Sequence, residues 1–467
     1  MELWQYDATD LARLIRVGQA SAREAVVSCL SRMDAVNGKL NAVVRRMDAE
    51  ALAAADAADA KRARGEALGP LHGVPVTTKV NTDQRGHPTD NGVVAFKDLM
   101  ATEDAPVVAN LRRAGAIFIG RTNAPAFSMR VFSENDLHGR THNPRDRGIS
   151  PGGSSGGAGS AVAAGIGPIG QGNDIGGSVR IPAYCNGIVG LRVGLGRVPT
   201  FNMSASAPRP IGAQLMSTQG PHVRSVRDAR LSLAVMAQGD PRDTRWADAP
   251  LVGPAVARPM RVALVPEVPG GFTHPAQAAA VRAAGRHLAA AGYAIEELVP
   301  PEFEEIVRVW HVIGSNDLFR ALAPNMEKYA DKDAITSMRL WLQLAPPSQD
   351  PSAVLEAFAQ RDRLLFLWQE FFMHHPLVIM PTLADLPPPF DQDLTLEGQR
   401  KLLDSLRVSL ITPTLGLLGL ALPVGSHGTL RTGVQIVAGR FREDLALDAG
   451  EVIEAAEGVV APIDPTW

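Results

Sequence analysis

The sequence predicts an α/β fold in which a central β-sheet is covered by helices on both faces. From Gly73 onward, short β-branched runs alternate with helix-prone segments, and this alternation is typical of layered α/β proteins. Of the 467 residues, 45 % are hydrophobic and 20 % are charged, which is the composition of a globular protein with a large core. Length alone would allow more than one domain, but one domain with a helical insertion is the better interpretation.

The N-terminal segment, residues 1–68, is expected to be a helical brace without chemistry. Ser21-Ala-Arg-Glu24 has the pattern of a capping box, which starts a helix. An amphipathic stripe continues behind it, at Val26, Val27, Leu30 and Met33. Residues 51–64 are alanine-rich and predict a second helix.

The later elements follow from the same patterns. Strands are expected at residues 74–78, 116–119, 261–265, 294–298 and 377–380, and helices at residues 105–114, 158–164 and 277–291. A mostly helical block spans residues 303–372 and carries Trp310, Phe319, Trp341, Phe358, Phe366, Trp368, Phe371 and Phe372. The proline-rich run Leu386–Phe390 is expected to be a loop after this block.

Charge and cysteine content exclude several classes of protein. A formal net charge of −3 gives no broad basic field, so nucleic acid is not an expected partner. The two cysteines, Cys29 and Cys185, cannot form a disulfide framework and are expected to be buried thiols. No signal-peptide core and no run of about 18 uncharged apolar residues is present. We therefore expect a cytoplasmic protein that does not span or bind a membrane.

The eleven histidines do not indicate a metal site. His374 and His375 are adjacent, so their rings diverge, and no H-E-x-x-H sequence occurs. His138 and His142 are four residues apart, but the glycine and turn residues near them argue against a helix that would hold them together. A histidine of this loop could still border a cleft.

Two glycine-rich turns and one lysine carry the chemical signal. Residues 151–157 read Pro-Gly-Gly-Ser-Ser-Gly-Gly and contain Ser154, and residues 173–180 read Asn-Asp-Ile-Gly-Gly-Ser-Val-Arg and contain Ser178. Glycine lets the backbone approach a reacting atom closely. Upstream, a β-branched run ends on Lys79. Two serines and a lysine among glycines, with no obligatory histidine, indicate nucleophilic acyl chemistry.

Two other segments in this stretch match known functional motifs only formally. Residues 153–157 formally match the G-x-S-x-G elbow with Ser155 as nucleophile, but residues 145–151 before it cannot be the central strand that the elbow needs. Residues 165–170 formally match G-x-G-x-x-G, but they follow an alanine-rich helix rather than a strand. We reject both interpretations.

The two serines and the lysine together resemble the amidase signature family, whose Ser–Ser–Lys triad hydrolyses amides. Secondary landmarks of that family occur in the family's order, at residues 122–125, 133–135, 141–144 and 217–221. The resemblance is densest between Gly69 and Asp228 and returns more weakly from Thr412. It implies a single domain over residues 1–467 built on a central mixed sheet, with a catalytic core at 69–230 and a helical insertion at 300–375 bordering the substrate pocket.

The resemblance also assigns roles to the serines and the lysine. Ser178 would be the nucleophile, Lys79 the base, and Ser154 the bridge that relays protons between them after a cis peptide bond at Gly153–Ser154. The two glycines before Ser178 let successive N–H groups converge on one point, so the backbone of Ile175, Gly176, Gly177 and Ser178 is the expected oxyanion hole.

Lys79 could act as a base only if its amine is neutral, which requires a pKa well below ~10.4. Its sequence neighbours Val74, Val76 and Val80 are apolar, and no acid stands within two residues of it. Many family members carry aspartate where this chain has Val80. That departure fits a neutral amine but removes a familiar partner.

Further residues are expected to support the turn or line the pocket. Ser155, Asp174 and Arg180 are expected to fix the turns by hydrogen bonds, with Asp174 and Arg180 as a buried pair. The expected pocket residues are Phe127, Met129, Phe132, Phe201, Met203 and Met216, each of which taken singly is more often core than pocket. Three departures from the family pattern lie outside the triad: Ala126 replaces a glutamate, Leu418 a proline, and Arg192-Val-Gly194 a Lys-Pro-Thr run.

The expected function is hydrolysis of a small-molecule amide through a serine acyl-enzyme, with no cofactor and no metal. The apolar pocket residues favour apolar or aryl amides and leave carbamates and esters open. The alternative within the resemblance is the glutaminase-like component of a tRNA-dependent amidotransferase, which would need partner subunits. An interaction protein with degenerate catalysis is a third alternative, disfavoured by the intact Lys79, Ser154 and Ser178. A homodimer also remains open.

Overall fold

One continuous sheet runs through the whole molecule and confirms the predicted α/β class. The computed structural model describes residues 1–205, 207–350 and 352–467. Within these residues, eleven strands form one sheet in the order β1-β3-β2-β4-β6-β5-β10-β11-β9-β7-β8. Their bounds are β1 Val43–Arg46, β2 Pro75–Lys79, β3 Ile117–Thr122, β4 Ile169–Asp174, β5 Val189–Arg192, β6 Thr218–Val223, β7 Arg261–Leu264, β8 Ala294–Glu297, β9 Leu377–Pro381, β10 Gly419–His427 and β11 Leu430–Ala438.

The sheet is mixed, because parallel and antiparallel pairs both occur. β2 lies parallel to β3 and to β4, and β7 lies parallel to β8 and to β9. The central strands β6, β5, β10 and β11 pair antiparallel with their neighbours. The carboxyl ends of β2 and β4 therefore meet at one edge of the sheet, where ligands of α/β proteins commonly bind.

Helices cover both faces of the sheet, as alternate residues of single strands show. Leu420 and Leu422 of β10 belong to a core cluster shared with α8, α9 and α15, whereas Ala421 between them packs with residues of α5 and α6 on the other face. Successive side chains of a strand point to opposite faces. The helices of these two layers are α5 Gly156–Ala163, α6 Arg180–Asn186, α8 Val226–Met236, α9 Pro275–Ala290 and α15 Glu443–Glu457.

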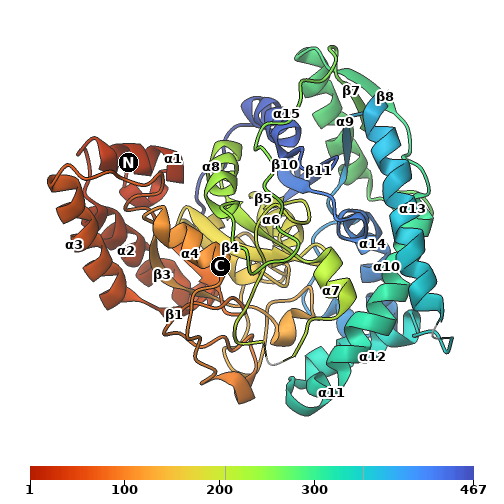
Figure 1. The fold of residues 1–467 in the computed structure, drawn as a ribbon, viewed down its shortest axis with the longest axis horizontal. Coiled ribbons are helices and arrows are strands. Elements are labelled where there is room, and N and C mark those ends of the chain that lie inside the picture. The colour runs from red at the N-terminus through yellow and green to blue at the C-terminus, as the bar shows by residue number, and fades with distance from the viewer. Residues whose placement is uncertain (206, 351) are drawn as a thin grey trace.

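The N-terminal helices lie at one end of the long axis of the molecule and the aromatic helical block at the other (Figure 1). The capping box at Ser21 is confirmed: Ser21 Oγ accepts from the Glu24 N–H, and the Glu24 side chain accepts from the Ser21 N–H. Other elements in the first half of the chain are η1 Leu3–Gln5, α1 Ala8–Arg16, α2 Ala22–Leu40, α3 Asp48–Ala63, η2 Val94–Phe96, α4 Pro106–Arg113, η3 Ala126–Ser128 and α7 Ile211–Met216.

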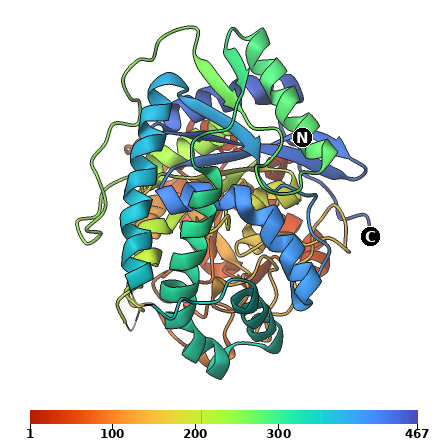
Figure 2. The ribbon, with the colours of Figure 1, turned by 90° about the vertical axis from the view of Figure 1, so that its right-hand side faces the viewer.

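The predicted helical block is present as a separate layer, which faces the viewer in Figure 2. It consists of α10 Phe303–Ile313, the π-helical turn η4 Gly314–Phe319, α11 Arg320–Tyr329, α12 Lys332–Leu344 and α13 Ser352–His374, followed later in the chain by η5 Gln392–Leu394 and α14 Leu396–Leu415. α10 packs against α13 and α14. Val378 and Met380 of β9 and the apolar residues of these helices share one core cluster.

The structure also contains strands that the sequence patterns did not indicate, among them β4, β5, β6, β10 and β11. β4 reads Ile-Gly-Gln-Gly-Asn-Asp, which has few of the residues that favour strands in isolation. None of the helices in the described ranges has the length and apolarity that crossing a bilayer requires.

Candidate active site

Strand pairing brings the lysine and the second serine turn together. Lys79 is the last residue of β2, and β4 lies parallel beside it with Val76 opposite Ile169. β4 ends at Asp174, and the turn that carries Ser178 follows directly. The first serine turn lies against the second, because the Ser155 N–H donates to the Ser178 carbonyl at 3.3 Å.

The amine of Lys79 is hydrogen-bonded to Ser154 inside the protein. Its Nζ lies 2.7 Å from Ser154 Oγ and 3.0 Å from Asn173 Oδ1. Lys79 has no exposed surface and Ser154 is 1 % exposed. The peptide bond between Gly153 and Ser154 is cis, as the resemblance implied. One half of the expected proton path, from lysine to the bridging serine, is therefore in place.

Burial lowers the pKa of Lys79 to about 7, although the charge of Asp174 acts in the opposite direction. Transfer of an ammonium group from water into a buried site disfavours its charged form. The adjacent residue Val80 is fully buried and places no carboxylate beside the amine. A substantial fraction of Lys79 is thus neutral near pH 7.

Ser178 lies at the surface end of this arrangement. It is half-buried, as are Ile175 and Gly176 of the same turn. Among the described residues its hydroxyl forms no hydrogen bond, so the second half of the expected path, from Ser154 to Ser178, is not closed by a hydrogen bond here.

One amide of the expected oxyanion hole is already engaged within the turn. The N–H of Gly177 donates to Asp174 Oδ1 at 2.9 Å, so this amide is already committed. Gly177 has φ +115°, and a Cβ there would lie 2.5 Å from Ile181 Cδ1, which explains why glycine is required. The amides of Ile175, Gly176 and Ser178 remain as candidate donors.

Asp174 ties the turn to the sheet. Its carboxylate accepts two hydrogen bonds from Arg180, at 3.0 Å each, and one from Arg192 at 3.2 Å. All three side chains are fully buried, and the two guanidinium groups hold the pKa of Asp174 well below its usual range against the effect of burial. The predicted Asp174–Arg180 pair is confirmed. Arg192, which the sequence marked only as a departure, is its third member.

Asn173 and Asn81 are site residues that the sequence patterns did not single out. Besides binding Lys79, the carboxamide of Asn173 exchanges hydrogen bonds with that of Asn81, at 2.9 and 3.2 Å. Asn81 in turn donates to Ser128 Oγ at 2.9 Å. The hydroxyl of Ser155, which was expected to fix the turn, makes only a long hydrogen bond of 3.5 Å to the Asn173 carbonyl. The one feature of the sequence that could have indicated these two residues is that Asn81, a polar residue, stands two positions after Lys79.

An aromatic cluster packs against the Ser178 turn. Trp310 Nε1 donates to the Ile175 carbonyl at 3.4 Å, and a Cβ on Gly176 would lie 3.4 Å from the Trp310 ring. Trp341 lies 5.4 Å from Trp310 and 5.3 Å from Phe319 between ring centroids. The predicted helical block therefore reaches the turn through Trp310.

The six expected pocket residues separate into three groups. Phe201 and Met203 line a cavity of about 480 Å³, together with Asn202, Arg209, Ser217 and Thr218 among others. Met216 is buried in the core of the aromatic layer, with Phe127 and Met129 partly buried against it. Phe132 is fully buried in a core cluster with Ile181 and Tyr184, so it does not line an open pocket.

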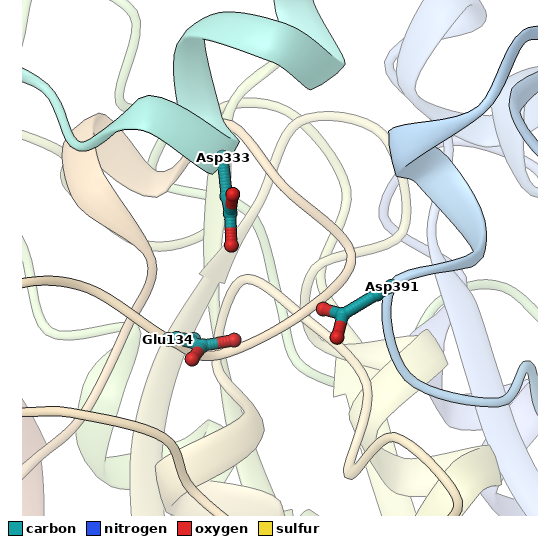
Figure 3. A group of neighbouring side chains, drawn as sticks. All are labelled: Glu134, Asp333 and Asp391. Atoms are coloured by element: carbon teal, nitrogen blue, oxygen red, sulfur yellow. The ribbon is translucent and has the colours of Figure 1, made fainter.

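The carboxylates of Glu134, Asp333 and Asp391 lie close to one another (Figure 3). They come from the loop after β3, from α12 and from the loop before η5. Arg140 donates to Glu134 at 2.8 Å and to Asp391 at 2.8 Å. The guanidinium of Arg140 already pairs with two of these carboxylates, so we interpret Glu134 and Asp391 as parts of an ion-pair network.

The histidines and cysteines near the site are structural. His138 Nε2 lies 3.1 Å from Asp90 Oδ1, whereas the His142 ring packs against Phe390 and Trp467. The two imidazoles thus do not converge. Cys29 and Cys185 are buried, and burial raises the pKa of Cys29 to about 12 and that of Cys185 further. Neither thiol is a nucleophile near neutral pH.

Comparison with known proteins identifies the family to which the chain belongs. The sequence profile of the amidase family matches residues 24–447. The chain is 47 % identical to an indoleacetamide hydrolase of Bradyrhizobium diazoefficiens over 464 residues, which cover 98 % of this chain and 88 % of that protein. It is 31 % identical to a glutamyl-tRNA(Gln) amidotransferase subunit of Acidothermus cellulolyticus, over 97 % of this chain and 95 % of that protein.

A solved structure of a 6-aminohexanoate cyclic dimer hydrolase superposes with a TM-score of 0.83 at 28 % identity, covering 98 % of each chain. The profile match, the identity to the hydrolase relative and the shared fold agree. This chain belongs to the amidase family and is a hydrolase of linear amide bonds.

Proposed function

We propose that the protein hydrolyses the primary amide of an aryl-substituted acetamide, releasing the carboxylic acid and ammonia. The observation that carries this proposal is the position of the Ser178 turn. On its inner side lie the buried Lys79 and Ser154, which are hydrogen-bonded to each other at 2.7 Å. On another side Trp310 packs on the same turn.

In the proposed first step, Ser178 Oγ attacks the amide carbonyl. Its proton passes to Ser154, which gives its own hydroxyl proton to the neutral amine of Lys79. The carbonyl oxygen becomes an oxyanion, which the N–H groups of Ile175, Gly176 and Ser178 stabilise. The proton then returns from Lys79 through Ser154 to the leaving nitrogen, which departs as ammonia.

In the second step, water attacks the ester that joins the acyl group to Ser178. The same relay takes a proton from the water and returns one to Ser178 Oγ, which regenerates the free serine. Each proton that Lys79 accepts is given back within the same step. The sequence of steps uses only side-chain and backbone groups of this chain.

The aromatic cluster supports an aryl acyl group. Trp310 lies against the turn with 4 % of its surface exposed, and the half-buried Trp341 ring lies 5.4 Å from it between centroids. Aromatic rings of a ligand pack well beside such side chains. The relative that is 47 % identical over 98 % of this chain is an indoleacetamide hydrolase. An indole ring is a bicyclic aryl group of the kind that this cluster would accommodate.

The test is hydrolysis of indole-3-acetamide by the purified chain alone, followed by release of ammonia and of the acid. We expect turnover without added subunits and a kcat/KM well above that for acetamide or glutamine. If the chain released ammonia only from glutamine and only with partner subunits, the amidotransferase alternative would replace this proposal.

Two further expectations stay predictions. A cytoplasmic location is testable by fractionation of the source cells. A homodimer is testable by sedimentation of the purified chain at several concentrations.

A further inference from the structure

The amine of Lys79 has two polar neighbours, and one of them has no part in the proton relay. Ser154 Oγ lies 2.7 Å from Nζ and Asn173 Oδ1 lies 3.0 Å from it. A carboxamide oxygen can only accept hydrogen bonds, so an N–H of Lys79 must point at Asn173. This contact removes rotational freedom from the amine.

Asn173 is itself held in one orientation by a chain of polar side chains. The Ser128 hydroxyl donates to Asn91 Oδ1 at 2.7 Å, so its lone pairs are left to accept from Asn81 Nδ2 at 2.9 Å. Asn81 Oδ1 then accepts from Asn173 Nδ2 at 2.9 Å. This sequence of donors and acceptors directs the oxygen of Asn173 toward Lys79.

The loop that anchors the chain is itself fixed. Phe127 and Ser128 have φ values of +55° and +61°, a backbone region that residues other than glycine rarely adopt. The Phe127 ring packs edge-on against Phe96 with ring centroids 5.8 Å apart. Unusual backbone angles of this kind persist where the surroundings enforce them, and they concentrate at functional sites.

A neutral Lys79 amine can engage both polar neighbours of Nζ. A neutral amine has two N–H groups and one lone pair, whereas an ammonium group has three N–H groups. With one N–H on Asn173, the lone pair is free to face the Ser154 hydroxyl.

The charged and titratable groups around the amine do not supply a competing partner. Asp174 acts on Lys79 from the end of β4, but Arg180 and Arg192 compensate its charge. His222 faces the site from β6, and burial lowers its pKa to about 4, so it is neutral near pH 7. Arg121 of β3 donates to the Lys79 carbonyl at 3.0 Å. Asn173 is thus the uncharged group that is positioned to orient the amine.

We propose that Asn173, oriented by Asn81, is a positioning residue that aims the lone pair of Lys79 at Ser154. This inference rests on the proposed role of Lys79 as the base. Asn173 touches neither substrate nor the reacting carbonyl in this assignment, and its effect is exerted through Lys79.

The test compares Asn173→Asp and Asn173→Ala by the pH dependence of Ser178 labelling with a fluorophosphonate. In this reaction Ser178 Oγ bonds to phosphorus, fluoride leaves, and the serine proton passes to the base, so the readout does not depend on which amide is the substrate. The carboxylate in Asn173→Asp would stabilise the ammonium form, so the midpoint of the acid limb should rise by about 1–3 pH units. Asn173→Ala should label about 10–100-fold more slowly, because the amine is no longer oriented, and its midpoint should not rise.

The control is Gln238→Glu, which makes the same amide-to-carboxylate change at an exposed position and should leave the profile unchanged. If both Asn173 variants lost rate equally at all pH values, with the native midpoint, Asn173 would be merely structural and the proposal overturned. Native profiles for both variants would overturn it too. Failure of the native chain to cut aryl acetamides, with labelling intact, would count against the proposed substrate and not against this role of Asn173.

Discussion

The guanidinium of Arg180 donates two hydrogen bonds to the carboxylate of Asp174, at 3.0 Å each, and so joins the two ends of the turn that carries Ser178. The same carboxylate accepts the N–H of Gly177 from inside the turn. The shape of the turn therefore depends on one fully buried carboxylate, which Arg192 also contacts.

Asp174→Asn should destabilise the protein strongly, since it leaves two buried guanidinium groups without a compensating charge. We expect the free energy of unfolding, measured in urea, to fall by about 3–5 kcal/mol. Asp56→Asn is the matched control, because Asp56 pairs with Arg23 at the exposed surface and should cost less than about 1 kcal/mol. Equal losses in the two variants would contradict this account of the turn.

The rate of amide hydrolysis should rise with pH through neutrality. In the proposed mechanism the active form of Lys79 is the neutral amine, and burial lowers the pKa of Lys79 to about 7. Below that pH the protonated amine cannot accept the proton that Ser154 must pass on. We expect kcat/KM for indole-3-acetamide to reach half of its plateau near pH 7. A flat profile between pH 5 and pH 8 would show that another group is the base.

The same lysine should make folding less favourable at low pH. Its pKa falls on folding from ~10.4 to about 7, so between these values the unfolded chain binds more protons than the folded one. The free energy of unfolding therefore rises with pH between about 7 and ~10.4. Below about pH 7 the native chain bears the full cost of burying the charged amine. The stability of Lys79→Met relative to the native chain should therefore be greater at pH 6 than at pH 10, by about 4 kcal/mol at ~1.4 kcal/mol per pKa unit. Urea unfolding should show this difference narrowing toward pH 10, and a pH-independent difference would refute the argument.

Ser178→Ala should abolish turnover and fluorophosphonate labelling while the far-ultraviolet circular dichroism stays native. Removal of a nucleophile typically costs several powers of ten in kcat, about 10⁶-fold in a measured serine enzyme. Ser155→Ala is the neighbouring control. Its hydroxyl makes one long hydrogen bond to a backbone carbonyl, so a modest loss is expected. Labelling that persisted in Ser178→Ala would assign the nucleophile elsewhere.

Trp310→Phe should weaken the preference for aryl acetamides. The smaller ring loses part of the surface beside Gly176 and the hydrogen bond to Ile175. An aromatic contact is worth about 0.5–1.5 kcal/mol, so kcat/KM for indole-3-acetamide should fall about three- to tenfold, with little change for acetamide. Trp368→Phe is the control, because Trp368 is buried and donates to the Pro301 carbonyl away from the turn. Equal losses on both amides would place the aryl group elsewhere.

The parts of the candidate site that lie in local motifs could be predicted from the sequence alone. Lys79, Ser154 and Ser178 each stand in a short stretch with its own glycine or β-branched pattern, and the capping box at Ser21 is likewise a local signal. The predicted strands were those rich in β-branched residues. β4 could not be predicted from the sequence because its Gly-Gln-Gly composition does not favour a strand. It is a strand because it pairs with β2 and β6.

The parts that were missed depend on contacts between distant segments. Asn173 meets Lys79 across 94 positions of sequence, and no spacing rule relates them. The engagement of the Gly177 N–H depends on where the Asp174 carboxylate points, which Arg180 and Arg192 determine. Phe132 resembles a pocket residue by composition but is buried by α6 and α14 residues that lie far away in the chain.

The aromatic surface beside the nucleophile turn comes from residues 303–344, which contribute no strand to the sheet. Lys79, Ser154 and Ser178, by contrast, come from β2, β4 and the loops next to them. This separation has an evolutionary consequence. After gene duplication, a copy could acquire a new substrate range through changes in this helical stretch, provided that the contact of Trp310 with the Ile175 carbonyl is kept.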